Sequence, residues 1–567
     1  MEQAILDATG LPIRRLKLSC LPKDRKKAAV PLGASPLKDG SWSYPADDIV
    51  VQVLQHTFGE ELTLTKKCQD WYQQAIDRRL FLREVALREG TIDNENIPWK
   101  DVLHPYQWQM VAFGREAKHF INSDDRGLGK TLEALTLAED QNCQRVLIVC
   151  PGYLKLNWER EILKWIGNDS NTYVTRGERA ERKAQVQTFM KQGRFLVVNY
   201  EMIRHKKDED PRTMKTGYPE LLTFNWDMII FDEAHRLKSR DSQWTLGAKH
   251  LSRVEHIQLL TGNPIASRPD DIWSLLHILR PEQYTSYWAF IEYYCNLVDT
   301  FFGKEIAGVN TSRMPQLQYT LQPHLLRRLK EDVAPDLPAK IQHEIFVELS
   351  GTQKTFYTRL QKQCIIELEN GDINLLPSLI EKSLRLQQAI ANPVLLGGKD
   401  DSVVERTCVD LLEDLFEGTN KVIVGTHFVE AANRLEALLS KQYKVFRVKA
   451  ELKDYQRDNV VESFKLCEEN AVLVGTIRTM SEGLNIDECD HIVFCDKSWS
   501  PLDNEQFADR IHRITSTRIK NYYSIVVKGT VSEIKEQVLE DKTQARDEIL
   551  SMKAVAAVLL KNSKSNS

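Results

Sequence analysis

The sequence of 567 residues has no apolar run long enough to cross a membrane, since the longest run near its C-terminus extends only from Ala554 to Leu560. Its ten cysteines are scattered from Cys20 to Cys495 without a CxxC pair or nearby His ligands at metal-site spacing, so we expect neither structural zinc nor a disulfide framework. The N-terminus lacks the basic and apolar segments of a signal peptide. Because reduced thiols suit an intracellular compartment, we predict an intracellular protein without a membrane partner, located in the cytoplasm or nucleoid, in the nucleus of a eukaryote or in the host cytoplasm of a virus.

A large excess of one charge is also missing. The net charge is −4, so the protein has no general attraction to polyanions, and any surface for nucleic acid must be a local basic track inside a cleft. Hydrophobic residues make up 42% and charged residues 28% of the chain, which is the balance of an ordinary globular protein. The length suggests about four domains of ~150 residues each.

The most informative segment is Asp-Asp-Arg-Gly-Leu-Gly-Lys-Thr-Leu, which begins at Asp124. Gly127 and Gly129 allow backbone N–H groups to turn inward around phosphate oxygens, and a helix that starts near Lys130 adds its positive end. Lys130 would reach the β and γ phosphates of a nucleotide, and the Thr131 hydroxyl would hold Mg²⁺. The strict phosphate-loop pattern has glycine where this sequence has Asp124, so an ordinary turn between strand and helix is the alternative.

A second chemical signal follows the apolar strand predicted at 228–231, where the sequence Asp-Glu-Ala-His begins. The carboxyl ends of parallel strands border the ligand crevice of open α/β sheets, so Asp232 and Glu233 would face the phosphate loop. Asp232 suits the Mg²⁺ shell, and Glu233 suits the positioning of the attacking water. Gln107, about twenty residues before the loop, offers one donor and one acceptor to adenine. A polar loop after a strand is the alternative for the two acids.

Buried strands alternate with helical segments in two stretches of the chain. This alternation predicts an α/β fold with two parallel sheets, each covered by helices on both faces. The second stretch has no phosphate loop, which predicts a single hydrolysis site. Residues 1–100 form an accessory region without a catalytic pattern, which could bind a protein partner. The strands expected in the first stretch are 145–150, 195–198, 228–231 and 256–260, and those in the second are 421–427, 471–476 and 491–495.

In their order and spacing, these motifs resemble the Swi/Snf-type (Snf-related) ATPases, the double-stranded-DNA translocase branch of helicase superfamily two. The resemblance covers about residues 103 to 535. It implies two RecA-like lobes in tandem with helical protrusions, ATP and Mg²⁺ bound at the cleft between the lobes, and duplex or forked DNA as the partner of a monomer. The implied domains are residues 1–100 for the accessory region, 101–345 for the first lobe with a protrusion at about 285–345, 346–535 for the second lobe with a protrusion at about 350–400, and 536–567 for a brace helix and polar tail.

The resemblance also implies roles for single residues. Arg510 and Arg513 would share one helical face and act on the γ-phosphate, where an arginine can contribute roughly 10³ to 10⁵ in rate. Surface arginines bonded to nearby acids are the alternative. The charged run that begins at Leu325 looks like the family's helical protrusion, and a solvated charged helix is its alternative. The remaining implied residues are Gly483 for nucleotide binding, Arg327, Arg328, Lys330 and Trp499 for DNA binding, with a core position as the alternative for Trp499, and Thr261 and Gln506 for coupling.

From these residues and the resemblance we predict an ATP-dependent double-stranded-DNA translocase or remodelling motor, which hydrolyses ATP to ADP and phosphate during DNA repair, replication-fork or recombination processing. Several departures from the family pattern, among them Asp125-Arg126 in the phosphate loop and Asn263 after the fourth strand, put the coupling of hydrolysis to DNA in doubt. None of them removes a catalytic group. The alternatives are a strand-separating DNA or RNA helicase and an ATP-switched nucleic-acid clamp without motor activity.

Overall fold

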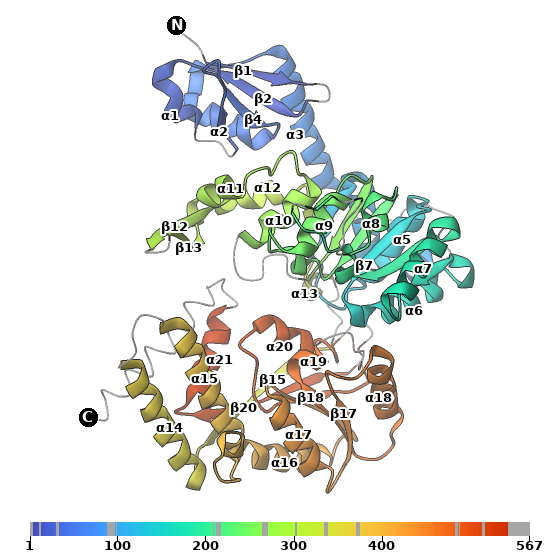
Figure 1. Cartoon of the computed structure of the whole chain (residues 1–567), viewed down its shortest axis with the longest axis vertical. Helices are drawn as coiled ribbons and strands as arrows, with labels where there is room; N and C mark the ends of the chain where they lie inside the picture. The colour runs from blue at the N-terminus through green and yellow to red at the C-terminus, as the bar shows by residue number, and fades with distance from the viewer. Residues whose placement is uncertain are drawn as a thin grey trace. The chain divides into compact units, whose positions relative to one another are not determined.

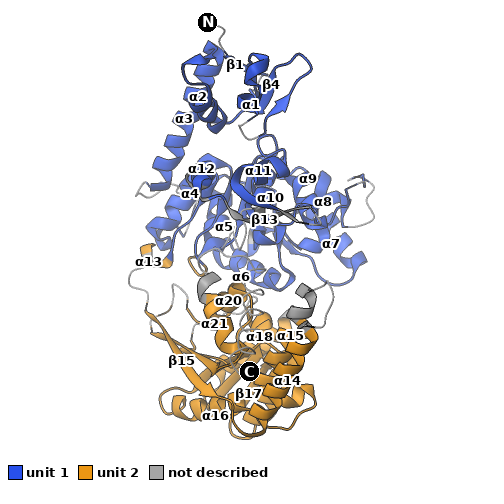
Figure 2. Ribbon diagram, turned by 90° about the vertical axis from the view of Figure 1, so that its left-hand side faces the viewer, with its two compact units in different colours: residues 1–125, 129–329 blue, residues 126–128, 330–567 orange. Residues whose placement is uncertain are grey.

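The computed structural model describes residues 4–542 except residues 11–12, 30–32, 88–96, 98, 208, 211, 213–216, 263–269, 301–302, 334–337, 370–374, 482–485, 487, 513–515 and 517. The chain divides into two compact units, coloured separately in Figure 2. Unit 1 comprises residues 1–125 and 129–329, and unit 2 comprises residues 126–128 and 330–567. Each unit is described by itself below.

Unit 1 begins with a small mixed sheet (Figure 1), which we call the N-terminal module together with its helices. The strand order is β3-β4-β2-β1-β5, in which only β1 and β5 pair in parallel. Alternate residues of β1 and β2 are buried, and they pack against the apolar face of α2. The elements of the N-terminal module are β1 (Ala4–Thr9), β2 (Arg15–Ser19), α1 (Arg25–Ala28), β3 (Ser35–Pro36), β4 (Trp42–Pro45), α2 (Asp48–Phe58), β5 (Leu62–Leu64) and α3 (Lys66–Leu87).

Helix α3 joins the module to the rest of unit 1. Near its start, Cys68 packs into the core of the module, whereas Leu82 and Val85 near its end pack into a core of the large sheet. One continuous helix therefore contributes to both cores, which makes the module part of the same compact unit.

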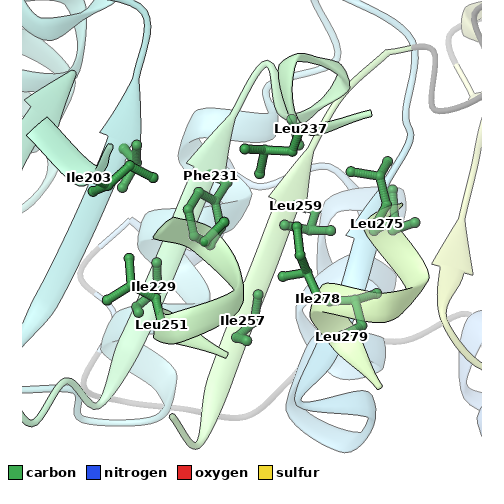
Figure 3. Close-up of a cluster of buried hydrophobic side chains, with 14 of the residues drawn as sticks. Ile203, Ile229, Phe231, Leu237, Leu251, Ile257, Leu259, Leu275, Ile278 and Leu279 are labelled. Atoms are coloured by element: carbon green, nitrogen blue, oxygen red, sulfur yellow. The ribbon is translucent and has the colours of Figure 1, made fainter. Parts of the chain in front are cut away.

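The large sheet of unit 1 is entirely parallel, in the order β14-β6-β11-β10-β7-β9-β8. Side chains of β10 alternate between its two faces: Ile229 and Phe231 enter one core, shown in Figure 3, while Met228 and Ile230 enter the other. Burial on both faces explains why the strands are nearly continuous hydrophobic runs. The strands are β6 (His119–Asn122), β7 (Val146–Cys150), β8 (Thr172–Val174), β9 (Phe195–Asn199), β10 (Met228–Asp232), β11 (His256–Leu260) and β14 (Leu325–Leu326).

Helices cover both faces of this sheet. Helices α4, α5 and α6 contribute to one core, and helices α7, α9 and α10 contribute to the other, where Leu251, Leu275, Ile278 and Leu279 meet the strands in Figure 3. The helices are α4 (Pro105–Ala117), α5 (Lys130–Asp140), α6 (Lys155–Trp165), α7 (Arg179–Gln192), α8 (Pro219–Thr223), α9 (Gln243–Leu251), α10 (Asp270–Leu279), α11 (Tyr287–Tyr294) and α12 (Met314–Leu321), and strands β12 (Cys295–Thr300) and β13 (Gly303–Val309) form a separate antiparallel pair.

The charged run that begins at Leu325 is not the helix that the resemblance implied. Leu325 and Leu326 form β14, which pairs in parallel with Ile121 and Asn122 of β6. Only α13 (Lys330–Val333) is helical in this run, and it has four residues. The leucines of the run extend the sheet, so Arg327 and Arg328 follow a strand end, and Lys330 begins the short helix α13.

Unit 2 contains a second, entirely parallel sheet in the order β15-β20-β19-β16-β18-β17. Hydrophobic cores lie on both of its faces, one formed with α14 to α17 and α21 and the other with α18, α19 and α20. Its strands are β15 (Lys340–Glu348), β16 (Lys421–Thr426), β17 (Lys444–Val448), β18 (Ala471–Thr476), β19 (His491–Phe494) and β20 (Lys520–Lys528). Its helices after α13 are α14 (Gly351–Glu369), α15 (Leu375–Ala391), α16 (Val403–Leu415), α17 (Val429–Leu439), α18 (Asp454–Leu466), α19 (Ile477–Met480), α20 (Pro501–Ala508) and α21 (Val531–Lys542).

The predicted α/β class with two parallel-sheet lobes is therefore confirmed. Most of the predicted brace helix and tail, residues 543–567, lies outside the described residues. Within the described part of the chain, none of the helices has the length and apolar character needed to span a bilayer.

Candidate nucleotide-binding site

The predicted phosphate loop connects the end of β6 to the start of α5. Gly127 and Gly129 have φ angles of 81° and 91°, a region that residues with a Cβ atom rarely adopt. A Cβ atom at position 129 would also overlap the side-chain amide of Gln107. Gln107 is buried on α4, and its Oε1 accepts a hydrogen bond from the backbone N–H of His104 at 3.0 Å. The structure thus brings Gln107 against the loop, although the two lie about twenty residues apart in the sequence.

Lys130 folds back over the loop that precedes it. Its Nζ donates to the backbone oxygens of Asp124 at 2.6 Å and Asp125 at 3.1 Å. Thr131 follows it in the first turn of α5 and is half-buried. A positive side chain, glycine backbone and a helix N-terminus therefore converge here, which is the arrangement that binds phosphate oxygens.

The two acids lie at the carboxyl end of β10, and β11 separates this strand from β6. Asp232 is held by several hydrogen bonds: its Oδ2 accepts from Trp158 Nε1 at 2.8 Å, its Oδ1 accepts from the backbone N–H of Glu233 at 2.9 Å, and its backbone oxygen accepts from the Tyr200 hydroxyl at 2.7 Å. Burial and the neighbouring Glu233 raise the pKa of Asp232 to about 6, while the positive charge of Lys130 acts in the opposite direction. The charge of the loop lysine therefore favours the ionised form of the strand-end carboxylate.

Glu233 has a φ angle of 53°, a left-handed conformation that is uncommon outside glycine. Its Oε2 lies 3.2 Å from His235 Nδ1. Strained backbone of this kind clusters at functional sites and is kept because it aims a side chain. This observation supports a role for Glu233 that a turn residue alone would not need.

A cluster of buried charged side chains holds the start of the phosphate loop in place. Asp124 is fully buried, and its Oδ1 accepts from the backbone N–H of Arg328 at 3.0 Å and from its Nε at 3.1 Å. The guanidinium also bonds Asp124 Oδ2 and the backbone oxygen of Tyr106. Glu133 lies 3.4 Å from the same guanidinium, and burial together with the Asp124 charge raises the pKa of Glu133 to about 8. Asp124 thus stands at a glycine position of the strict motif because a buried arginine balances its charge.

This cluster contradicts the predicted DNA contact of Arg328, whose side chain is 8% exposed and bonded inside unit 1. The predicted DNA contact of Lys330 is wrong for the same reason. Lys330 is equally buried, and its Nζ donates to the backbone oxygen of His512 at 3.0 Å. Trp499 is also 8% exposed and belongs to the core of unit 2. This is the core position that the sequence analysis gave as the alternative to DNA binding. Arg327 is exposed, so its contact with DNA stays a prediction.

The predicted catalytic arginines belong to unit 2. Helix α20 ends at Ala508, so Arg510 lies beyond the helix and the expected helical face does not extend to it. Arg510 Nε donates to the backbone oxygen of Gln506 at 3.1 Å, and Nη2 donates to that of Ser481 at 2.6 Å. Arg513 and Gly483 lie outside the described residues.

The predicted coupling residues are both buried. The backbone N–H of Thr261 follows β11 and donates to the backbone oxygen of Asn122 at 3.0 Å, immediately before the phosphate loop. Gln506 lies in α20 of unit 2. Sequence reasoning gave no role to Trp158, Tyr200 or the pairing of Arg328 with Asp124. Tyr200 directly follows β9, so a polar-capable aromatic at a strand end was the available signal for it, whereas Trp158 lies inside α6 and had no such signal.

The two parallel-sheet lobes and the phosphate loop define an ATPase of helicase superfamily two. The family model described as SNF2-related domain matches residues 106–395, and the model described as helicase conserved C-terminal domain matches residues 406–515. Since the first match covers slightly more than half of the chain, the chain belongs to the SNF2-related family.

Two relatives illustrate the similarity. Chromodomain-helicase-DNA-binding protein 6 of Homo sapiens is 26% identical over 546 residues, which cover 87% of this chain and 19% of the relative. Chromodomain-helicase-DNA-binding protein 7 of Gallus gallus is 27% identical over 538 residues, which cover 87% of this chain and 17% of the relative. The chain thus spans about a fifth of the length of these relatives.

Among solved structures, the Sulfolobus solfataricus SWI2/SNF2 ATPase core in complex with dsDNA matches 83% of this chain and 97% of its own, with 22% sequence identity and a TM-score of 0.39. Such a low TM-score supports no comparison of the two whole chains.

Proposed function

We propose that this protein is an ATP-driven motor that moves along duplex DNA, hydrolysing ATP to ADP and phosphate. The observation that carries the proposal is the phosphate loop between β6 and α5, where Gly127 and Gly129 have positive φ angles and Lys130 Nζ donates to the backbone oxygens of the loop. Members of this family are ATPases. The nucleic acid along which the protein moves, the direction of movement and the biological process are part of the proposal.

Each residue of the site has a proposed role in hydrolysis. Gly127, Gly129 and Lys130 hold the phosphates, and Gln107 contacts the adenine. Glu233 positions the attacking water. Arg510 and Arg513 of unit 2 stabilise the charge on the transferring phosphoryl group, which requires Arg510 to exchange its backbone partners for the nucleotide.

Mg²⁺ fits the residues of this site. The Thr131 hydroxyl and the Asp232 carboxylate are hard oxygen ligands, which Mg²⁺ prefers. Burial of Asp232 beside Glu233 raises the pKa of Asp232, so a divalent cation would offset a negative charge that the protein alone compensates poorly. Bound Mg²⁺ would supply neutralisation of the phosphate charge, while Trp158 and Glu233 N–H hold the Asp232 carboxylate in orientation.

DNA as the partner rests on the family and on the relatives, two of which carry DNA binding in their names. Within this chain, exposed Arg327 is the remaining basic candidate of its run. We propose repair, replication-fork or recombination processing as the context, and a monomer as the working form.

The test is steady-state ATP hydrolysis by the wild type and by Glu233→Gln, each with no polymer, duplex DNA, single-stranded DNA, forked DNA and RNA. We expect duplex or forked DNA to stimulate the wild type strongly, and Glu233→Gln to bind ATP but to hydrolyse it at least ~10²-fold more slowly. Stimulation by RNA or single strands alone would support a strand-separating helicase instead. A single turnover without further hydrolysis would support an ATP-switched clamp.

A further inference from the structure

Unit 1 contains a cavity of about 500 Å³ that is separate from the nucleotide site. It lies between the N-terminal module and the large sheet, and His119, the first residue of β6, contributes to its wall. The phosphate loop follows the last residue of the same strand, Asn122. The cavity is therefore at the opposite end of β6 from the phosphate loop, and its volume is in the range of small-molecule sites.

Most of the charged side chains that line the cavity, but not all of them, form ion pairs with one another in the described part of the chain. Four are basic and four are acidic, and six of them form three ion pairs. The pairs are Arg79 with Asp48, in which Nε lies 2.9 Å from Oδ2, Arg78 with Glu116 at 3.0 Å, and Lys118 with Glu255 at 2.7 Å. Arg280 and Asp47 are left outside these pairs.

Arg280 is a half-buried cation without a carboxylate partner among the described residues. Its guanidinium makes one hydrogen bond to the described residues, from Nη2 to the backbone oxygen of Ala117 at 3.2 Å, and burial lowers its pKa. Asp47 forms no ion pair with it in the described part of the chain; its Oδ1 accepts from the backbone N–H of Ile49 at 3.0 Å, and burial and the adjacent Asp48 raise the pKa of Asp47 to about 7. A partly buried charge that lacks a counterion costs free energy, which binding of an anion would recover.

Two further polar atoms in the wall have no hydrogen-bond partner in the described part of the chain. His324 is 6% exposed, and its Nδ1 is buried without a partner, while burial holds the pKa of His324 well below its usual value. Gln283 donates through Nε2 to the backbone oxygen of Ala46 at 3.2 Å, but its Oε1 is buried and unpartnered. An amide oxygen accepts hydrogen bonds only, so it requires a donor such as a hydroxyl group.

We propose that this cavity binds a small hydroxylated organic anion, with the anionic group at Arg280 and a hydroxyl group donating to Gln283 Oε1. His324 Nδ1 contributes a further hydrogen bond. The ligand would contact both α3 and the residues around the start of β6, so binding stabilises the docking of the N-terminal module on the large sheet. This site is independent of the proposed motor function.

The test uses the full chain carrying Lys130→Ala, so that anion binding at the phosphate loop is suppressed and no ATP hydrolysis is needed. Calorimetric titration and thermal unfolding are measured with glycerol 3-phosphate, inorganic phosphate and glycerol. We expect saturable binding of glycerol 3-phosphate, weaker binding of phosphate, no binding of glycerol, and a rise of several degrees in the unfolding midpoint at saturating glycerol 3-phosphate.

Arg280→Gln is expected to weaken glycerol 3-phosphate binding by at least ~10-fold. Without ligand, its unfolding midpoint should be unchanged or higher, because the variant removes a half-buried charge that has no carboxylate partner among the described residues. Arg253→Gln, at an exposed position outside the cavity, removes the same charge and should bind like its parent.

Absence of saturable binding by both anions, or unchanged affinity in Arg280→Gln, would overturn the proposal. A lower midpoint of Arg280→Gln without ligand, combined with an unchanged ligand-induced rise, would show that Arg280 is structural. Equal affinity for phosphate and glycerol 3-phosphate would overturn the hydroxyl assignment at Gln283.

Discussion

The two large sheets of this protein are both parallel, and each has an aspartate at the carboxyl end of a buried strand, but the two aspartates have different hydrogen-bond partners. In unit 1, the Asp232 carboxylate accepts from Trp158 Nε1 at 2.8 Å and from the backbone N–H of Glu233 at 2.9 Å. In unit 2, Asp496 follows β19, and its Oδ1 accepts from Thr426 Oγ1 and from the backbone N–H of His427, each at 2.6 Å. These bonds join the end of β19 to the end of β16. We therefore expect a strand-end carboxylate to take part in hydrolysis only in the sheet that carries the phosphate loop, whereas Asp496 joins two strands of its own sheet.

The most direct test of this difference compares Asp232→Asn with Asp496→Asn, two isosteric changes at equivalent strand ends. We expect Asp232→Asn to reduce ATP hydrolysis at saturating ATP and Mg²⁺ by on the order of 10³-fold, because a neutral amide is a poor partner for Mg²⁺. Asp496→Asn keeps the acceptor oxygen for Thr426 and should remain within about 3-fold of wild type. Comparable losses in both variants would show that the two carboxylates are not functionally distinct.

The buried cluster behind the loop sharpens the comparison, because unit 1 supports its phosphate loop with an ion pair. Arg328→Ala leaves Asp124 buried without its counterion and should destabilise unit 1 by about 3 kcal/mol. The adjacent Arg327→Ala removes an exposed arginine and should change stability by less than about 0.5 kcal/mol. Denaturant unfolding measures both.

The same pair of variants also separates a structural arginine from a DNA-binding one. If Arg327 contacts a DNA phosphate, Arg327→Ala should flatten the salt dependence of DNA binding by up to about one counterion. A stable Arg328→Ala protein with a flattened salt dependence would instead restore Arg328 to the DNA-binding candidates.

The glycine conformation gives a third way to test the loop. Gly129→Ala would place a Cβ atom against Gln107 at a φ angle of 91°, so ATP binding should weaken by at least ~10-fold. Gly152→Ala is the matched control, since its added Cβ atom meets open space. Titration with a fluorescent ADP analogue measures both, and equal affinities would argue that the loop conformation changes on binding.

The smallest effect concerns Glu133, whose folded pKa of about 8 lies above its ordinary value of 4.5 because of burial and Asp124. The folded state therefore holds this proton more tightly than the unfolded state, and this group costs stability progressively as pH rises from about 5 to 8. Glu133→Gln removes that dependence, so its stability relative to wild type should increase as the pH rises over this range. Denaturant unfolding at pH 5.5 and pH 8 tests the sign.

Much of the nucleotide site was predictable because its chemistry is local in the sequence. Glycines before Lys130 and acids after an aliphatic strand each indicate a function within a few residues, and parallel strands bring their carboxyl ends to one edge. Arg328 was misassigned because its partner, Asp124, lies 204 residues away. A basic residue in a charged run is read as solvated or DNA-binding unless its buried partner is known. Helical spacing likewise failed for Arg510, because nothing in the sequence marks the end of α20 at Ala508.

The sequence by itself determined the α/β class, the two parallel sheets and the phosphate loop with its acids, because hydrophobic periodicity and short motifs act over a few neighbouring residues. Only the tertiary structure decided that Leu325 and Leu326 extend the sheet, that Arg328 neutralises Asp124, and that Arg280 lines a cavity without a counterion. The physical reason is that the free energy of a charge depends on burial and on partners distant in the chain, which no local pattern records.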